Sequence, residues 1–230
     1  MKGVDDPLGK KLLPFVLSII AGSVDVIGFL GLGGLFIAHI TGNLVILAAK
    51  LVVGDQAPVA HLISVPVFMV VLAVTRVLAA GLERIQVASL PPLLFLQLVL
   101  LSAFLAICIA AGPRLDLNAA NMVFAAMLGV AAMAVQNALV RLSLTRSPST
   151  AVMTTNVTVF TMDVGEMLFG RDANRIAEAR NRAKVTWPAI TGFLLGCALG
   201  ALSEAALGLR SLVLPTSLAV IAVALGVVRV

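Results

Sequence analysis

Charged residues are scarce in this chain of 230 amino acids. Asp, Glu, Lys and Arg together make up 12% of the sequence, which is about half their share in an average soluble domain. Hydrophobic residues make up 60%, and the mean hydropathy is +1.11. The alternating strands of about 10 residues that build an outer-membrane barrel are missing too. The composition therefore predicts an all-α polytopic membrane protein.

Residues suited to metal or group-transfer chemistry are also few. The chain has two cysteines, Cys108 and Cys197, and both fall inside apolar runs, where lone cysteines usually act as small packing residues. The sequence contains no metal-type cysteine spacing, no nucleotide-binding loop, no H-E-x-x-H motif and no G-x-S-x-G motif. We therefore expect no metal, no other cofactor and no enzymatic activity.

The apolar residues form eight segments separated by charged or turn-forming residues. They run approximately over 12–32, 38–53, 60–82, 90–112, 119–142, 150–168, 185–206 and 211–229. A membrane span needs roughly 20 apolar residues, so the second and sixth segments are short. The first follows Lys10 and Lys11 as a signal sequence would, but no cleavage site follows. We therefore expect it to remain as the first helix.

A polar motif occurs twice, once in each half of the chain. Thr41-Gly42-Asn43 begins the second segment, and Thr154-Thr155-Asn156 begins the sixth, 113 positions later. Two prolines recur in the same order, Pro66 with Pro188 and Pro92 with Pro215. The paired prolines are farther apart than the two motifs, and the difference fits an insertion of about nine residues within 170–184. These landmarks predict two membrane repeats, residues 1–113 and 114–230.

The placement of basic residues decides between two topologies. If all eight segments cross, 11 Lys and Arg lie inside and 5 outside; if each short segment adds no net crossing, the numbers are 13 and 3. The positive-inside rule favours the second arrangement, and it also explains the net charge of +5 without nucleic-acid binding. Each half then crosses three times, so we predict inverted repeats, each with a short broken or re-entrant half-helix, and both termini in the cytoplasm.

Two groups of residues resemble a known family. The stretches Gly22-Ser23-Val24-Asp25 and Phe36-Ile37-Ala38-His39-Ile40-Thr41-Gly42-Asn43 resemble the first signature of the YoaK-like family of bacterial integral membrane proteins. Val135-Gln136-Asn137-Ala138, followed by Met153-Thr154-Thr155-Asn156, resembles its second signature. The resemblance covers nearly the whole chain. It implies a multi-helix protein of the bacterial inner membrane and supplies no established substrate.

Asp25 is the first candidate site residue, because it lies in the middle of the first apolar segment. An ionised carboxylate at this depth costs roughly 2.5–3.5 kcal/mol on insertion scales, so it must pair, bind a cation or hold a proton. The alternative is a structural carboxylate bonded to a neighbouring helix. His39 precedes the first motif and could exchange a proton or bond a free carbonyl of the broken backbone.

The remaining candidates are polar residues around the two motifs. Thr and Asn can cap helices, and a half-helix that begins inside the membrane presents N–H groups and a partial positive charge to a solute. The alternatives are capping and interhelical hydrogen bonding. The complete set of candidate substrate-binding residues is Asp25, His39, Thr41, Asn43, Gln136, Asn137, Thr154, Thr155 and Asn156.

Further features have more ordinary interpretations. Arg141 and Arg146, at the end of the fifth segment, are expected to be cytoplasmic anchors, with an anion-attracting vestibule as the alternative. Asp163 and Glu166 share a helical face and are expected to pair with nearby basic residues. The basic stretch 170–184 is expected to be a cytoplasmic loop or short surface helix. Small residues four apart favour close helix packing, within the chain or in a homo-oligomer; here they are Gly192, Gly196 and Gly200.

These features favour a secondary transporter or facilitator of a small polar or anionic solute across the inner membrane. Proton or ion coupling would use Asp25. The alternatives are a passive channel with two half-helices meeting at the midplane, or a non-transporting membrane scaffold. The expected partners are the lipid bilayer and the solute.

Overall fold

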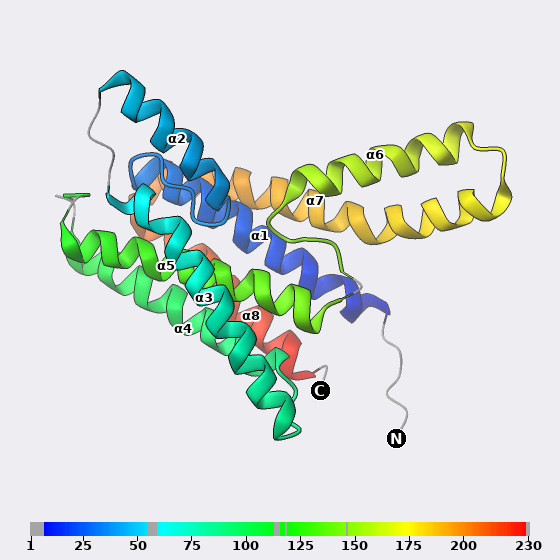
Figure 1. Cartoon of the computed structure of the whole chain (residues 1–230), viewed down its shortest axis with the longest axis horizontal. Helices are drawn as coiled ribbons and strands as arrows, with labels where there is room; N and C mark the ends of the chain where they lie inside the picture. The colour runs from blue at the N-terminus through cyan, green and yellow to red at the C-terminus, as the bar shows by residue number, and fades with distance from the viewer. Residues whose placement is uncertain (1–6, 55–58, 113–115, 118, 146, 229–230) are drawn as a thin grey trace.

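The computed structural model describes residues 7–54, 59–112, 116–117, 119–145 and 147–228. These residues fold into helices joined by short connections (Figure 1). The helices are α1 (Pro7–Gly31), α2 (Ile40–Val53), α3 (Val59–Arg84), α4 (Leu90–Ala111), α5 (Ala120–Ser143), α6 (Met153–Phe169), α7 (Ala173–Leu207), the 3₁₀ helix η1 (Gly208–Leu212) and α8 (Val213–Val228). Every predicted apolar segment is helical, which confirms the all-α class.

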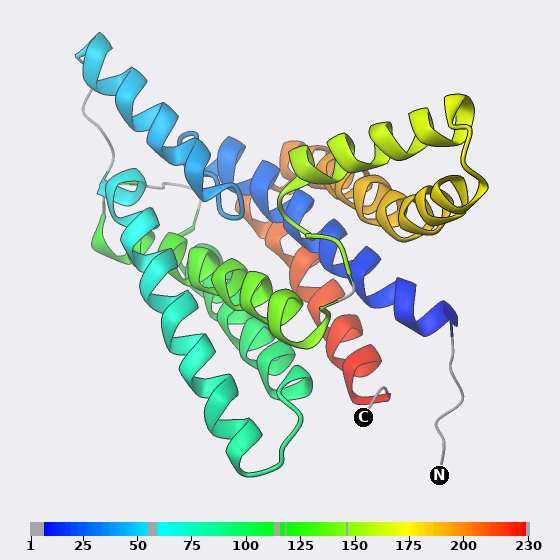
Figure 2. The same cartoon turned by 45° about the vertical axis from the view of Figure 1, so that its right-hand side comes forward.

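Five helical segments among the described residues are long and apolar enough to cross a membrane. They are Leu12–Gly31, Val59–Arg84, Leu90–Ala111, Ala120–Ser143 and Ala173–Val228. The last has 56 residues and includes both α7 and α8. The chain reverses at η1, where Gly208 has a φ of +59°, so α8 runs back along the molecule (Figure 2). These helices fit a multi-pass membrane protein.

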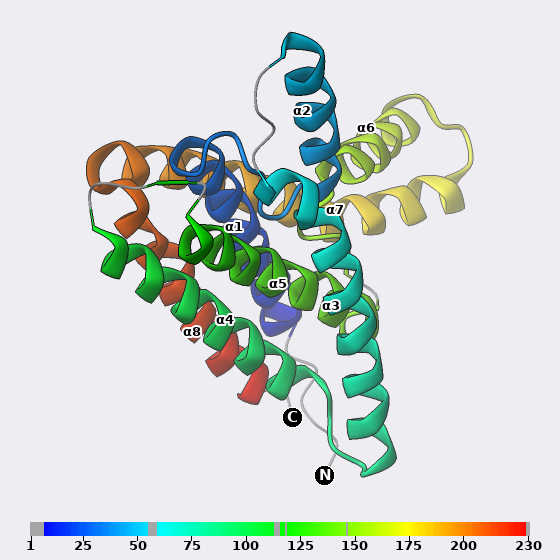
Figure 3. The ribbon, with the colours of Figure 1, turned by 60° about the vertical axis from the view of Figure 1, so that its left-hand side comes forward.

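The centre of the molecule is built from α1 and α5. In each of these helices 78% of the apolar window is buried, against 17% in α3 and 33% in α4. Helix α1 packs on α7 and α8, while α5 packs on α3 and α4, and α4 meets α8 (Figure 3). The first helix of each half therefore packs on the last two helices of the other half. The exposed, apolar faces of the outer helices suit contact with lipid.

Close contact between α1 and α7 depends on glycine. A Cβ added at Gly192 would lie 2.8 Å from the carbonyl oxygen of Phe15, and one at Gly200 would lie 2.8 Å from the Cα of Ser23. Gly196 lies against the backbone of Ile19 in the same way. The predicted small-residue stripe is thus a packing surface within the chain. A second copy would have to use another surface, because α1 already covers this one.

The connections lie at two ends of the molecule. In Figure 1 the end of α2, the starts of α3 and α5, the end of α4 and the α7–α8 connection lie toward the left. The start of α1, the end of α8, the α3–α4 turn and the α6–α7 turn lie toward the right and bottom. Helices α2 and α6 both begin near the middle and diverge toward opposite ends (Figures 1 and 2).

The basic stretch 170–184 differs from the expected loop or short surface helix. From Ala173 onward it is the first part of α7, whose 35 residues exceed the 26 of α3 by nine. Asp172 caps this helix, because its Oδ1 accepts the N–H of Asn174 at 2.8 Å. Alanine, arginine and glutamate favour helix. The polar residues of this stretch therefore show that α7 extends beyond the apolar region, and they do not mark the end of a helix.

Candidate functional site

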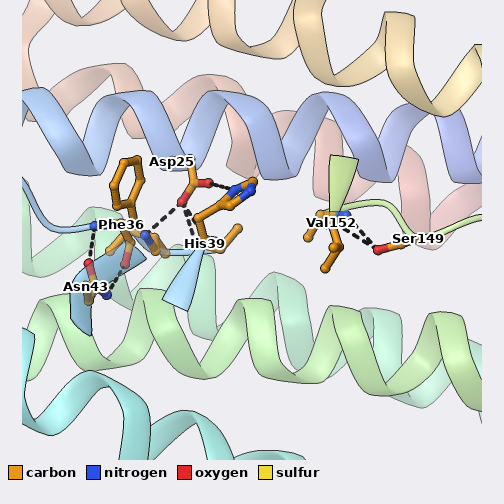
Figure 4. A network of polar contacts seen from close by, with 9 residues as sticks. Asp25, Phe36, His39, Asn43, Ser149 and Val152 are labelled. Carbon is orange, nitrogen blue, oxygen red and sulfur yellow. Dashed lines mark hydrogen bonds and ion pairs between the residues drawn. The ribbon is translucent and has the colours of Figure 1, made fainter. Parts of the chain in front are cut away.

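The loop between α1 and α2 is held by Asp25. Helix α1 ends at Gly31, and the chain turns back through Gly33 and Gly34, whose φ angles are +65° and +87°. The buried Asp25 Oδ1 then accepts three consecutive backbone N–H groups, from residues 37, 38 and 39, at 2.9, 2.6 and 3.1 Å. Its Oδ2 lies 2.8 Å from Nδ1 of His39 (Figure 4). Both carboxylate oxygens therefore have partners inside the protein.

Asn43 closes the same loop from the other side. Its Oδ1 accepts the N–H of Phe36 at 2.8 Å, and its Nδ2 donates to the carbonyl of Phe36 at 2.8 Å (Figure 4). Nδ2 also donates to Oγ of Ser64 on α3 at 3.1 Å. The side chain is fully buried. Asn43 thus ties the first turn of α2 to the preceding loop and to α3, while the neighbouring Thr41 is exposed.

The second half repeats part of this arrangement. Nδ2 of Asn156 donates to the carbonyl seven residues earlier, that of Ser149, at 2.7 Å. The N-cap positions of α2 and α6, His39 and Val152, are 113 residues apart, and neither makes a side-chain capping bond. In the place of the carboxylate, Oγ of Ser149 accepts the N–H of Val152 at 2.9 Å (Figure 4). The start of α6 is thus held by a neutral hydroxyl.

Gln136 connects this loop to the centre of the protein. Its Nε2 donates to Oγ1 of Thr150 at 3.0 Å and to the carbonyl of Leu17 on α1 at 2.9 Å. Its Oε1 accepts Nε2 of Gln97 on α4 at 2.6 Å. Gln136 and Gln97 are fully buried. This amide pair links α1, α4 and α5, which is the helix-bonding alternative considered for Gln136.

A cavity of about 750 Å³ lies at the start of α6. It is open to the surface and is bordered by the end of α5, the loop before α6, α6 itself and the first part of α7. The residues that line it are Asn137, Val140, Arg141, Thr145, Ser147, Pro148, Ser149, Val152, Thr155, Asn156, Val159, Asn181, Arg182, Val185 and Thr186. Of the residues that the structure describes, two arginines and no acidic residue belong to the lining, and Arg146, an arginine noted in the sequence, lies outside the described residues. Its volume suits a small solute.

The two arginines of the lining differ in their partners. Arg182 donates from Nε and Nη2 to Oδ1 of Asp163, at 3.0 and 2.6 Å. Asp163 is 3% exposed, and its other oxygen has no partner in the described part of the chain. Glu166 lies 3.8 Å from Arg175, so the expected pairing of both acidic residues with basic ones is confirmed. Arg141 is exposed and has no hydrogen-bond or ion-pair partner among the described residues.

The candidate residues therefore fall into separate groups. Asn137, Thr155 and Asn156 line the cavity, while Asp25, His39 and Asn43 hold the α1–α2 loop. Gln136 belongs to the amide pair, and Thr41 and Thr154 are exposed on the first turns of α2 and α6.

The sequence interpretation gave no binding role to Ser149 or Arg182. The charge pattern offered no way to distinguish Arg182 from the other basic residues of its stretch.

The helices and polar clusters together define the class: a helical protein that fits a multi-pass membrane topology. A family model described as "Protein of unknown function (DUF1275)" matches residues 13–225, and the chain belongs to this family. No curated protein matches the chain, and no solved structure does. The match confirms that the chain belongs to a family of unknown function, and no relative confirms the YoaK-like name.

Proposed function

We propose that this protein is a secondary transporter or facilitator of a small polar or anionic solute, and that the cavity at the start of α6 is its solute site. The observation that carries the proposal is a space of about 750 Å³ in which hydroxyl, amide and guanidinium groups face a largely apolar lining of valines and a proline. A helix that begins at such a space presents unbonded N–H groups and a partial positive charge. Irregular backbone at membrane depth is tolerated where it lines a cavity.

The difference between the half-helices supports placing the site in the second half. At the start of α2, the Asp25 carboxylate compensates the partial positive charge of the helix from within the protein. At the start of α6, the acceptor is the neutral hydroxyl of Ser149. The sequence also puts Ser149 and Val152 where the first half has Phe36 and His39. We attribute the space at the start of α6 to the smaller side chains of Ser149 and Val152 at these two positions.

The proposal includes inverted repeats in the bacterial inner membrane, with the YoaK-like relationship as its family context. Helices α1 and α5 run in opposite directions in Figures 1 and 2, as do α4 and α8. The reciprocal packing of α1 and α5 on the opposite halves agrees with this symmetry. The end of the molecule that holds the α3–α4 and α6–α7 turns carries most of the basic residues, which favours a cytoplasmic location for that end and for both termini.

Asp25 is a weaker candidate for the coupling group than its position in the sequence suggests. A carboxylate that accepts three backbone N–H groups and contacts His39 stabilises the loop as an anion and offers no free oxygen to a solute. This observation gives weight to the second candidate function, a passive channel, which needs no titrating group. The two half-helices that begin near the middle of the molecule fit that architecture, as an analogy of fold.

Uptake into proteoliposomes tests the proposal. The purified protein would be given labelled phosphate, succinate and glycerol, with and without an inward proton gradient. We expect uptake of at least one probe, blocked by Thr155→Trp, which fills the cavity, and retained by Val157→Trp on the exposed side of α6. Accumulation driven by the gradient would identify a transporter, and equilibration alone would identify a channel. No uptake of any probe, or equal loss in both variants, would contradict the proposal.

A further inference from the structure

We infer that the cavity at the start of α6 selects oxoanions, and that Arg141 and Arg182 are the residues that bind them; this inference rests on the proposed function of the cavity. Among the described residues, the lining contains two guanidinium groups and no carboxylate, and Asp163, which pairs with Arg182, lies outside it. Charges of one sign at a water-accessible cavity raise the local concentration of the opposite ion. A guanidinium group presents paired N–H donors that match the oxygens of phosphate or carboxylate.

The contacts of Arg182 leave part of its donor set available. Asp163 accepts Nε and Nη2 through the single oxygen Oδ1. Nη1 is 3.9 Å from Glu178, which is too long for a hydrogen bond. An arginine carries five N–H donors; Nη1 forms only this long ion pair with Glu178, so its hydrogen-bond donors remain available to an anion in the cavity. Asp163, which is 3% exposed, acts as a positioning residue because it fixes the opposite edge of the guanidinium group.

Arg141 supplies the second positive charge without an internal counterion. It lies in the last turn of α5, and no described residue pairs with it. Arginine prefers a counterion or water when it stands at a cavity wall. The Ser149 and Thr155 hydroxyls in the same lining can donate to further oxygens of the anion. The set therefore suits a tetrahedral or planar oxoanion better than a cation or an apolar ligand.

The same chemistry could recognise a soluble oxoanion or the phosphate of a lipid headgroup. Isothermal titration calorimetry of the full chain in an uncharged detergent, with sodium phosphate as the probe and glycerol as the neutral control, tests the shared chemistry. We expect saturable phosphate binding that Arg141→Gln weakens at least about tenfold, the loss of roughly one charge-assisted hydrogen bond. Arg84→Gln, an exposed arginine at the end of α3, is the matched control and should bind like the wild type.

Arg182 is tested by a conservative change, because Arg182→Gln would leave Asp163 buried without a partner. Arg182→Lys keeps the positive charge beside Asp163 but loses the planar fork, so phosphate affinity should fall while the unfolding temperature stays near the wild-type value. Repeating the titration in nanodiscs of neutral lipid, with and without phosphatidylglycerol, separates the two sources. Loss of phosphate binding only when phosphatidylglycerol is present would identify the headgroup; unchanged binding would identify a soluble oxoanion.

Two results would overturn the inference. One is phosphate binding no stronger than glycerol binding, and the other is an equal loss of affinity in Arg84→Gln and Arg141→Gln. These results are distinguishable from failure of the proposed function. Glycerol uptake that Thr155→Trp blocks, without phosphate binding, would leave the proposed function standing and remove the anion selectivity. Phosphate binding without uptake of any probe would support the anion selectivity and contradict the proposed transport function.

Discussion

Replacing Asp25 by alanine should destabilise the protein more than any change at an exposed carboxylate. The substitution removes the acceptor of three consecutive backbone N–H groups and the partner of His39. These groups lie in the loop between α1 and α2, where Ile37 and Ala38 are buried, and no other acceptor in the described part of the chain bonds to them. A buried N–H without an acceptor costs free energy in a membrane protein as it does in a soluble one.

The magnitude follows from the bonds lost. A hydrogen bond to a charged acceptor contributes about 1.5–3 kcal/mol in soluble proteins, and polar contacts between membrane helices contribute about 0.6–2 kcal/mol. At about 1 kcal/mol for each of the three N–H bonds, Asp25→Ala should lower the free energy of unfolding by about 3 kcal/mol. Asp25→Asn keeps one oxygen as an acceptor but loses the charge, so about half of that loss is expected.

The measurement is reversible unfolding in mixed micelles, followed by the loss of helical circular dichroism. Asp172→Ala is the matched control, because Asp172 caps α7 from an exposed position with one bond of 2.8 Å and a longer one of 3.4 Å. Loss of such a cap costs about 1 kcal/mol. Equal free energies of unfolding for Asp25→Ala and Asp172→Ala would refute the argument that the carboxylate holds the loop.

Three further predictions concern packing, the loop and topology. Gly196→Ala should destabilise the protein by about 2 kcal/mol, because the added Cβ would meet the α1 backbone. Gly81→Ala is the control: its Cβ meets nothing within 4 Å, so it should be neutral or slightly stabilising. Thermal unfolding compares the two variants. Asn43→Ala removes three hydrogen bonds and should lower the free energy of unfolding in the micelle assay by about 3 kcal/mol. A loss under about 1 kcal/mol would contradict the role of Asn43 in holding the α1–α2 loop. Single cysteines at Lys50 and Arg84 should react with membrane-impermeant reagents from opposite sides of the membrane, and labelling from one side would contradict the topology.

The positions of the helices could be predicted from the sequence because the signal is local. The fourth segment was predicted over 90–112 and forms Leu90–Ala111, since a continuous apolar run is bounded by prolines at its start and glycine at its end. The extension of α7 was missed because hydropathy falls at residues 173–184 while helix propensity does not. Apolar periodicity reports burial in the membrane, and it does not report where a polar helix continues beyond it.

The polar contacts could be predicted only in part. The burial of Asp25 at membrane depth required a partner, but the identity of the three N–H donors depends on the fold-back of the chain at Gly33 and Gly34. The matching bonds of Asn43 and Asn156 follow from the repeat that the sequence displays. The cavity could not be predicted, because the residues that line it come from α5, the loop before α6, α6 and α7, and only the fold brings these segments together.

The most direct test of the central claim is whether a solute passes through the cavity at the start of α6. Thr155→Cys would be made in a chain whose Cys108 and Cys197 are replaced by alanine, reconstituted, and treated with a charged, water-soluble thiol reagent while uptake of the transported probe is measured. The account predicts that the reagent stops uptake and that a reductant restores it, with no effect on Val157→Cys. Unchanged uptake after complete modification of Thr155→Cys would contradict the claim.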